Sequence, residues 1–207
     1  MKAYRSYFFL NTLSLLLIGA LIVYAKFFDL SVGSLFLPPS SPPHFTVGFL
    51  THAFQILCSV PPIICAFSFS LLNIIQPRRR ENLFILCSAL LTGGFLFNEI
   101  YRIHIILLSV GIPKLVTVSV YSIFLFGYAI GFRQRIQATP YLILLTGLSL
   151  LFLGITVDSL HLGSEAIPTF LEGIPKLFSE INIAFYFWYI CYSEVVRSLK
   201  YSPQTEY

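Results

Sequence analysis

The feature that most constrains this chain is a series of apolar runs, each long enough to cross a lipid bilayer, with short polar segments between them. Of its 207 residues, 57% are hydrophobic and only 11% are charged. A soluble globular domain carries about a quarter charged residues, so this chain cannot cover a surface that faces water. The sequence therefore predicts an all-α, polytopic integral membrane protein in which residues 1–207 form a single transmembrane domain.

Six of these runs reach the length of about 20 residues that a transmembrane helix needs. Their expected ranges are 7–28, 47–75, 82–108, 114–132, 140–158 and 176–196. The first is longer than the apolar part of a signal peptide, about 7–15 residues, so we expect it to be retained. Pro61 and Pro62 lack backbone donors, and the second helix is expected to kink or open there. If the sixth helix begins at Pro175, that proline takes a favoured first-turn position.

Lysine and arginine are distributed unevenly between the two sides that six crossings create. The side of both termini carries nine: Lys2, Arg5, Arg78, Arg79, Arg80, Arg133, Arg135, Arg197 and Lys200. The other side carries four: Lys26, Arg102, Lys114 and Lys176. Because cytoplasmic loops are enriched in these residues, we expect a multi-pass protein of the cell membrane with both termini in the cytoplasm. Because the cations fall in short loops between apolar runs, we attribute the net charge of +4 to orientation in the lipid bilayer and do not expect nucleic acid as a partner.

The four cysteines, at positions 58, 65, 87 and 191, all lie within apolar runs. Their spacing matches neither a zinc motif nor a disulfide framework. We expect them to be small buried hydrophobic residues.

The stretch NEIYRIH, residues 98–104, places ionisable side chains inside an apolar run. Glu99 follows Asn82 by 17 residues, or about 25 Å along a helix, which puts it near the outer boundary. On one continuous helix, Asn98 and Glu99 would share a face with Arg102. Most other ionisable residues of the spans also fall in the outer half, and such groups usually face the bundle interior and mark function. We therefore expect an outward-facing polar pocket with these candidate ligand-binding residues: Glu99, Arg102, His104, Asp158, His161 and Glu180.

Each of these residues also has a purely structural interpretation. Glu99 and Arg102 could form an ion pair that fixes helix packing, and Asp158 and His161 could mark a helix end that reaches water. Glu172, Lys176 and Glu180 are spaced four apart and could form a ladder of opposite charges at the interface. His52 could be a core histidine satisfied by a hydrogen bond.

A metal site is a further alternative. It needs three or four ligands at bonding distance, and the candidates are His52, His104, Asp158 and His161. The sequence has no HExxH motif and no histidine pair four residues apart. A divalent metal thus stays one candidate cofactor, and no catalytic residue is identified.

The order of several segments resembles a group of uncharacterised bacterial multi-spanning membrane proteins. These segments are NEIYRIH, GIPK, FRQRI, LFLGITVDSL and LEGIPKLFSEINIAFYFWY, within residues 95–195. The resemblance implies corresponding roles for Glu99, His104, Asp158, Glu172, Lys176 and Trp188. Asn98 and Gly173 stand where the group has acids. The chain also bears a looser likeness to intramembrane hydrolases of the alkaline ceramidase type. It lacks the closely spaced histidine pairs of those enzymes.

Three functional hypotheses follow. The first is a transport-like or binding protein whose outward-facing pocket takes a cation, a small polar ligand or a lipid headgroup. The second is a membrane-embedded hydrolase that acts on a lipid with a metal-bound water as nucleophile. The third is a structural subunit that docks membrane-protein partners through its polar face.

Overall fold

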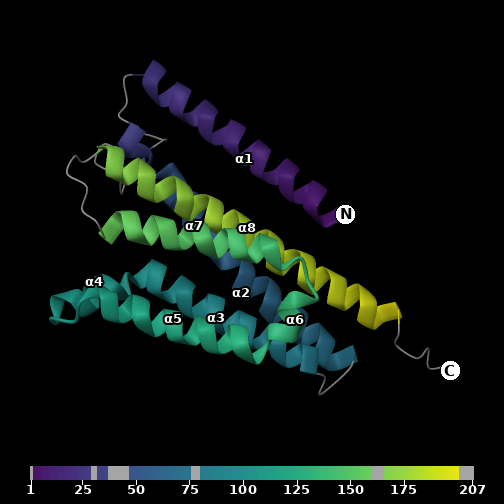
Figure 1. Cartoon of the computed structure of the whole chain (residues 1–207). Helices are drawn as coiled ribbons and strands as arrows, with labels where there is room; N and C mark the ends of the chain where they lie inside the picture. Colours follow the sequence, from purple (N-terminus) through teal and green to yellow (C-terminus); the bar gives the residue numbers. More distant parts are fainter. Residues whose placement is uncertain (1, 29–31, 37–46, 76–79, 160–165, 201–207) are drawn as a thin grey trace. The chain divides into compact units, whose positions relative to one another are not determined.

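A computed structural model describes residues 2–28, 32–36, 47–75, 80–159 and 166–200. Within these ranges every element is helical (Figure 1). The elements are α1 (Lys2–Phe27), η1 (Val32–Phe36), α2 (Phe49–Ile75), α3 (Arg80–Tyr101), α4 (Ile103–Ser109), α5 (Lys114–Gly131), α6 (Arg133–Gln137), α7 (Tyr141–Ser159) and α8 (Ala166–Lys200). The prediction of an all-α protein is confirmed.

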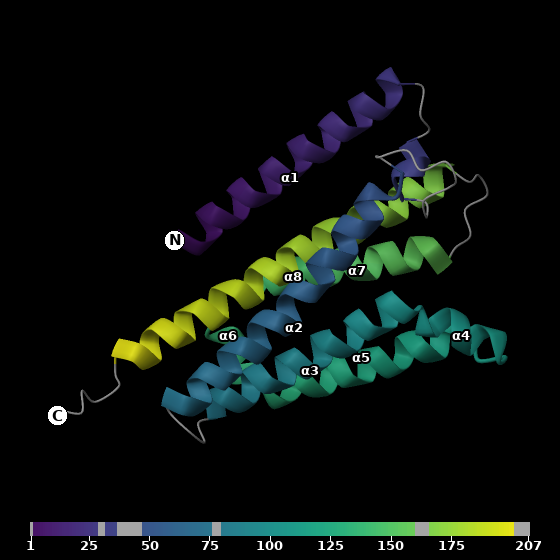
Figure 2. The ribbon, with the colours of Figure 1, turned by 180° about the vertical axis from the view of Figure 1, so that it is seen from behind.

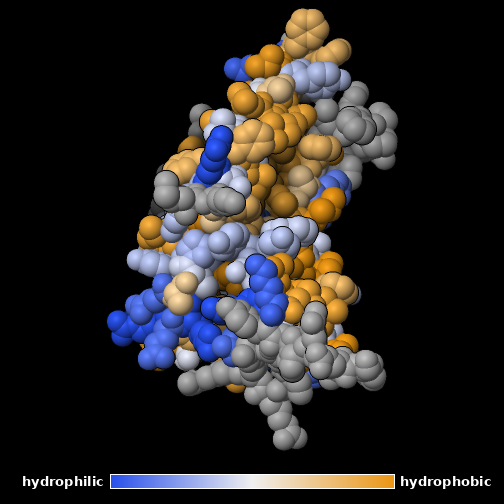
Figure 3. Space-filling model, turned by 90° about the vertical axis from the view of Figure 1, so that its right-hand side faces the viewer, coloured by the Kyte–Doolittle hydropathy of each residue, from blue (hydrophilic) through white to orange (hydrophobic). Residues whose placement is uncertain are grey.

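Four described helices, α1, α2, α3 and α5, are long and apolar enough to cross a membrane. The apolar part of α7 is shorter, and α8 contains several charged residues along its 35 positions. Large apolar side chains point outward on these helices, for example Phe9 and Leu115, which are 70% and 75% exposed. Figure 3 shows hydrophobic residues over much of the face that it draws. Exposed apolar surface of this extent is typical of a protein that lies in lipid.

The predicted span 82–108 is wrong in one respect, because it is two helices. Arg102 has a left-handed backbone, with φ 48° and ψ 46°, and it separates α3 from α4. A left-handed residue cannot continue the hydrogen-bond ladder of a right-handed helix, and Arg102 O instead accepts from the N–H groups of Ile105 and Ile106. The spacing that would put Asn98 and Glu99 on one helix face with Arg102 therefore does not apply.

Two predictions about proline are corrected in part, the opening of the second helix and the start of the last helix. α2 stays helical through Pro61 and Pro62, both of which are buried, so the helix does not open there. Pro175 lies inside α8, which begins at Ala166 and not at the proline. Tertiary packing explains the early start, because Gly173 lies directly against the ring of Phe36 and Ile174 packs on a hydrophobic core.

The chain divides into two compact units, each described by itself. Unit 1 comprises Met1–Leu57 and Leu142–Phe185, and unit 2 comprises Cys58–Tyr141 and Tyr186–Tyr207. The core of unit 1 joins residues from α1, η1, α2 and α8: Ile18, Ala25, Leu35, Leu50, Leu177 and Ile181. η1 is fixed to the start of α2, since Thr51 Oγ1 donates to Phe36 O at 2.8 Å and Gly48 N donates to Ser34 O at 2.9 Å.

In unit 2, α3 and α5 run side by side with α4 at one end, as the two opposite views show (Figures 1 and 2). Phe84 of α3 stacks on Tyr128 of α5, with ring centroids 5.7 Å apart, and Phe132 completes the aromatic cluster. At the same end, Arg135 of α6 forms an ion pair with Glu81 of α3 at 2.5 Å. These contacts join α3, α5 and α6.

Three cysteines behave as predicted, because Cys58, Cys65 and Cys191 are free and buried, whereas Cys87 is free but only half-buried. Within unit 2, Cys65 of α2 and Cys191 of α8 bring their Sγ atoms to 3.8 Å. A disulfide needs a separation of about 2.05 Å, so only a small shift would join them.

A membrane-permeant oxidant is therefore expected to link Cys65 to Cys191. Peptide mapping by mass spectrometry should find this disulfide in preference to any that involves Cys87, and Cys65→Ser should abolish it. Efficient pairing of Cys191 with Cys87 instead would contradict the arrangement of α2 and α8 in unit 2.

Candidate functional site

The strongest concentration of buried polar side chains in the described chain lies on α8. Ser179, Glu180 and Asn182 are 0%, 2% and 1% exposed. One turn before Glu180, Lys176 pairs with Glu172, a further turn earlier, at 2.5 Å, and both are partly exposed. The predicted ladder is thus an ion pair at its start, but its last member, Glu180, lies in the protein interior. We call Ser179, Glu180 and Asn182 the α8 polar cluster.

Helix α1 contributes one direct partner to this cluster. Asn11 Nδ2 donates to Asn182 Oδ1 at 2.9 Å and to the carbonyl of Tyr7, one turn earlier on α1, at 3.0 Å. Asparagine inside apolar helices is costly unless it is bonded, so this contact fixes α1 against α8 within unit 1.

Helix α7 approaches α8 through two glycines that are seven residues apart and so lie on one face. A Cβ atom on Gly147 would be 2.9 Å from Ile183 Cγ1 and 3.2 Å from Ser179 O. A Cβ atom on Gly154 would be 2.7 Å from Lys176 Cγ and 3.2 Å from Glu172 O. Small residues of this kind let transmembrane helices pack closely, and here they close α7 over the α8 polar cluster.

The cluster offers oxygen ligands in a nearly water-free place. Ser179 Oγ forms no hydrogen bond within the part of the chain that the structure describes. Most buried polar atoms have a partner, so the orphaned hydroxyl of Ser179, the residue before the buried Glu180, marks a candidate ligand position. The arrangement suits a species that takes hydroxyl and carboxylate oxygens, which is the preference of hard cations.

The other predicted site residues are placed only in part. Glu99 is half-buried on α3, and its carboxylate lies close enough to Tyr121 of α5 to interact with it electrostatically. Arg102 is exposed at the α3–α4 break, and His52 is exposed on α2. The side chains of His104 and Asp158, and the whole of His161, lie outside the described residues.

The structure provides no metal-binding group in the ranges it describes, where no three His, Cys, Asp or Glu side chains come together. The metal candidates His104, Asp158 and His161 do not belong to these described side chains. Sequence reasoning did find Glu180, but it missed Ser179, Asn182 and their partner Asn11. Polar amides within apolar runs, together with the Gly147–Gly154 spacing, were the available signals.

The fold and the cluster define a class: a helical protein with four candidate membrane spans and a buried polar cluster on its last helix. The chain belongs to the family described as Domain of unknown function (DUF8692), whose profile matches residues 10–190. No curated protein and no solved structure matches the chain.

Proposed function

We propose that the protein is a multi-pass membrane protein that binds a small cation at the α8 polar cluster, with Glu180 as the charged ligand. The proposal uses residues of unit 1 alone. Among the acidic residues of the expected outward-facing pocket, Glu180 is the one whose described side chain is fully buried.

The observation that carries the proposal is the burial of Glu180. It lies 14 residues from the start of α8 and 20 from its end, or about 21 Å and 30 Å along the helix, far from either terminus. An acidic side chain at the centre of a membrane helix costs about 2.5–3.5 kcal/mol on insertion. Groups that carry such a cost usually serve a function, and a carboxylate is a ligand group that hard cations prefer.

The neighbours of Glu180 favour a cation over an anion. Ser179 Oγ adds a hydroxyl oxygen without a hydrogen bond among the described residues, and Asn182 adds an amide that Asn11 holds in place. Oxygen-rich surroundings of this kind suit alkali, alkaline-earth or ammonium ions.

For the topology, we propose six membrane crossings with both termini in the cytoplasm. The helices α1, α2, α3 and α5 would supply four. The 19 residues of α7 reach about 28 Å, close to the hydrocarbon thickness of about 30 Å, and α8 is longer still. The excess of nine over four lysine and arginine residues supports the orientation.

Thermal unfolding in detergent tests the cation site. Sodium, potassium, magnesium and calcium chloride would be compared with N-methyl-D-glucamine chloride at equal ionic strength. We expect at least one of these cations to stabilise the native protein, by about 2.7 kcal/mol at a hundredfold excess over its Kd. Glu180→Gln should abolish this stabilisation, because the amide keeps the shape and removes the charge.

Glu194→Gln is the matched control, since Glu194 is on the same helix and pairs with the exposed Arg197 at 3.2 Å. This variant should keep the full cation response. The proposal fails if no cation in the panel stabilises the native protein, or if Glu180→Gln responds as the native protein does.

A further inference from the structure

Unit 2 contains a long groove between α3, α4 and α5 that the proposed cation site does not use. Its volume is about 980 Å³, at the upper end of the range of about 300–1,000 Å³ that is typical of ligand sites. The lining residues along α5 and at its C-cap run from Val116 to Phe132, which corresponds to about 24 Å along the helix axis. The groove therefore has the length and volume for an extended ligand.

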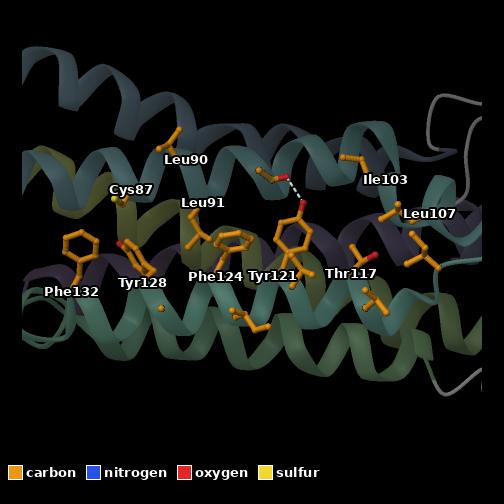
Figure 4. Close-up of a pocket in the computed structure, with 16 residues that line it drawn as sticks. Cys87, Leu90, Leu91, Ile103, Leu107, Thr117, Tyr121, Phe124, Tyr128 and Phe132 are labelled. Carbon is orange, nitrogen blue, oxygen red and sulfur yellow. Dashed lines mark hydrogen bonds between the residues drawn. The ribbon is translucent and has the colours of Figure 1, made fainter. Parts of the chain in front are cut away.

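The lining is almost entirely apolar, with leucine and isoleucine from α3 and α4 on one wall and mainly valine and phenylalanine from the α5 side on the other (Figure 4). Gly94 of α3 and Gly127 of α5 also line it, and a Cβ atom at either position would meet nothing within 4 Å. The two glycines thus keep space open where larger residues would fill it.

Two of the polar side chains that line the groove form hydrogen bonds, and a third does not. Tyr121 donates to the carbonyl of Gly94 at 3.0 Å (Figure 4), and Tyr128 shares a hydrogen bond of 2.6 Å with Ser88. Thr117 Oγ1 has no hydrogen-bond partner in the described ranges, although the residue is only 8% exposed. Figure 4 shows Thr117 turned into the groove near Leu107 of α4. A buried, unsatisfied hydroxyl at one end of an apolar groove indicates a ligand with a polar end group.

The charge around that end indicates the sign of the end group. Lys114 is three residues before Thr117 and shares its face of α5, and Arg102 directly precedes the lining residue Ile103. Glu99 is the one described acid nearby, through its interaction with Tyr121. Among the described residues around this end, two basic residues and one acidic residue give a formal charge of +1, which favours an anionic group.

We propose that the groove binds a free long-chain fatty acid, with the hydrocarbon chain along α5 toward Phe132 and the carboxylate accepting a hydrogen bond from Thr117 Oγ1. Hydrocarbon chains gain little by leaving lipid for an apolar groove. Selection for this ligand therefore depends on its polar end. Thr117 and the basic residues beside it provide that selection.

Photolabelling of the purified full-length protein in nanodiscs tests the proposal. The probes are a diazirine analogue of palmitic acid and a phosphatidylcholine that carries the same diazirine chain. We expect the fatty acid probe to label residues of α3 and α5 that line the groove, saturably and in competition with palmitic acid. Thr117→Val should weaken its binding about tenfold, as the loss of one hydrogen bond to a charged group implies.

Gly127→Leu should fill the groove and remove most of the labelling. Gly19→Leu is its matched control, because Gly19 lies in the middle of α1 with open space around it and should leave labelling unchanged. Thr156→Val controls for Thr117→Val, since Thr156 already donates to Phe152 O. Should Gly127→Leu not fold, Gly94→Leu fills the groove from the facing wall.

Three results would overturn the proposal. One is equal labelling of the groove by the phosphatidylcholine probe, which would make the occupant an ordinary bilayer lipid. Another is labelling that Gly127→Leu or Gly94→Leu leaves intact, and the third is unchanged binding to Thr117→Val.

Discussion

Tyr186→Ala is expected to lower the free energy of unfolding by about 3–5 kcal/mol, as truncation of a buried aromatic residue does. Tyr186 is 0% exposed and packs edge-to-face on Phe187, with ring centroids 5.2 Å apart. Its hydroxyl shares a hydrogen bond of 2.9 Å with Thr139 Oγ1. The truncation thus removes a large apolar volume and a contact between α8 and the α6–α7 turn in unit 2.

Equilibrium unfolding in mixed detergent micelles measures this change. The fluorescence of Trp188, the single tryptophan, reports on α8 two residues away. Tyr186→Phe separates the two contributions, because it keeps the ring and removes the hydroxyl, and should cost about 1 kcal/mol. Thr139 Oγ1 would still donate to Ile136 O at 2.6 Å. If Tyr186→Ala cost no more than Tyr186→Phe, the ring would not be part of the core.

Gly147→Ala is expected to destabilise the protein by about 1–3 kcal/mol, the usual cost of overpacking. The added methyl group would lie 2.9 Å from Ile183 Cγ1 and 3.2 Å from the backbone oxygen of Ser179. The side chain of Ile183 is branched and buried, and the Ser179 carbonyl is part of a helix, so neither can move away easily. α7 would have to separate from α8 to admit the methyl group.

Gly19→Ala provides the comparison, because nothing lies within 4 Å of the position and alanine is a better helix former than glycine. It should be neutral or slightly stabilising in the same assay. Gly147→Ala should also weaken the cation response of the α8 polar cluster, since Ser179 lies at the clash. Equal stability of the two variants would mean that α7 does not approach α8 closely in unit 1.

The sequence was informative about most of the helix ends. The apolar runs at 47–75, 114–132 and 140–158 correspond to Phe49–Ile75, Lys114–Gly131 and Tyr141–Ser159 within two residues at each end. These ends coincide with proline, glycine or charged residues, whose local preferences stop a helix whatever surrounds it. The break at Arg102 was not predictable, because arginine is a good helix former and rarely adopts a left-handed backbone.

The candidate site was likewise predictable only in part. The sequence identified Glu180 as unusual, because an acid within an apolar run is costly wherever that run lies. It did not identify Asn11 or Ser179, since small polar residues are common in such helices and only their partners distinguish them. It also placed no ligand groove between α3 and α5, because its lining differs in no way from a lipid-facing surface until the helices are set side by side.

Composition and the length of the apolar runs determined that this chain is helical and suited to lipid, because backbone groups without water must bond within their own segment. The sequence also determined most helix ends, because proline, glycine and charged residues act on the backbone of their neighbours in the chain. The tertiary structure alone decided that Ser179 and Glu180 are buried, that α7 closes on α8 at Gly147, and that Thr117 faces an open groove. Each of these depends on atoms that are distant in sequence, and their approach is set by packing between helices.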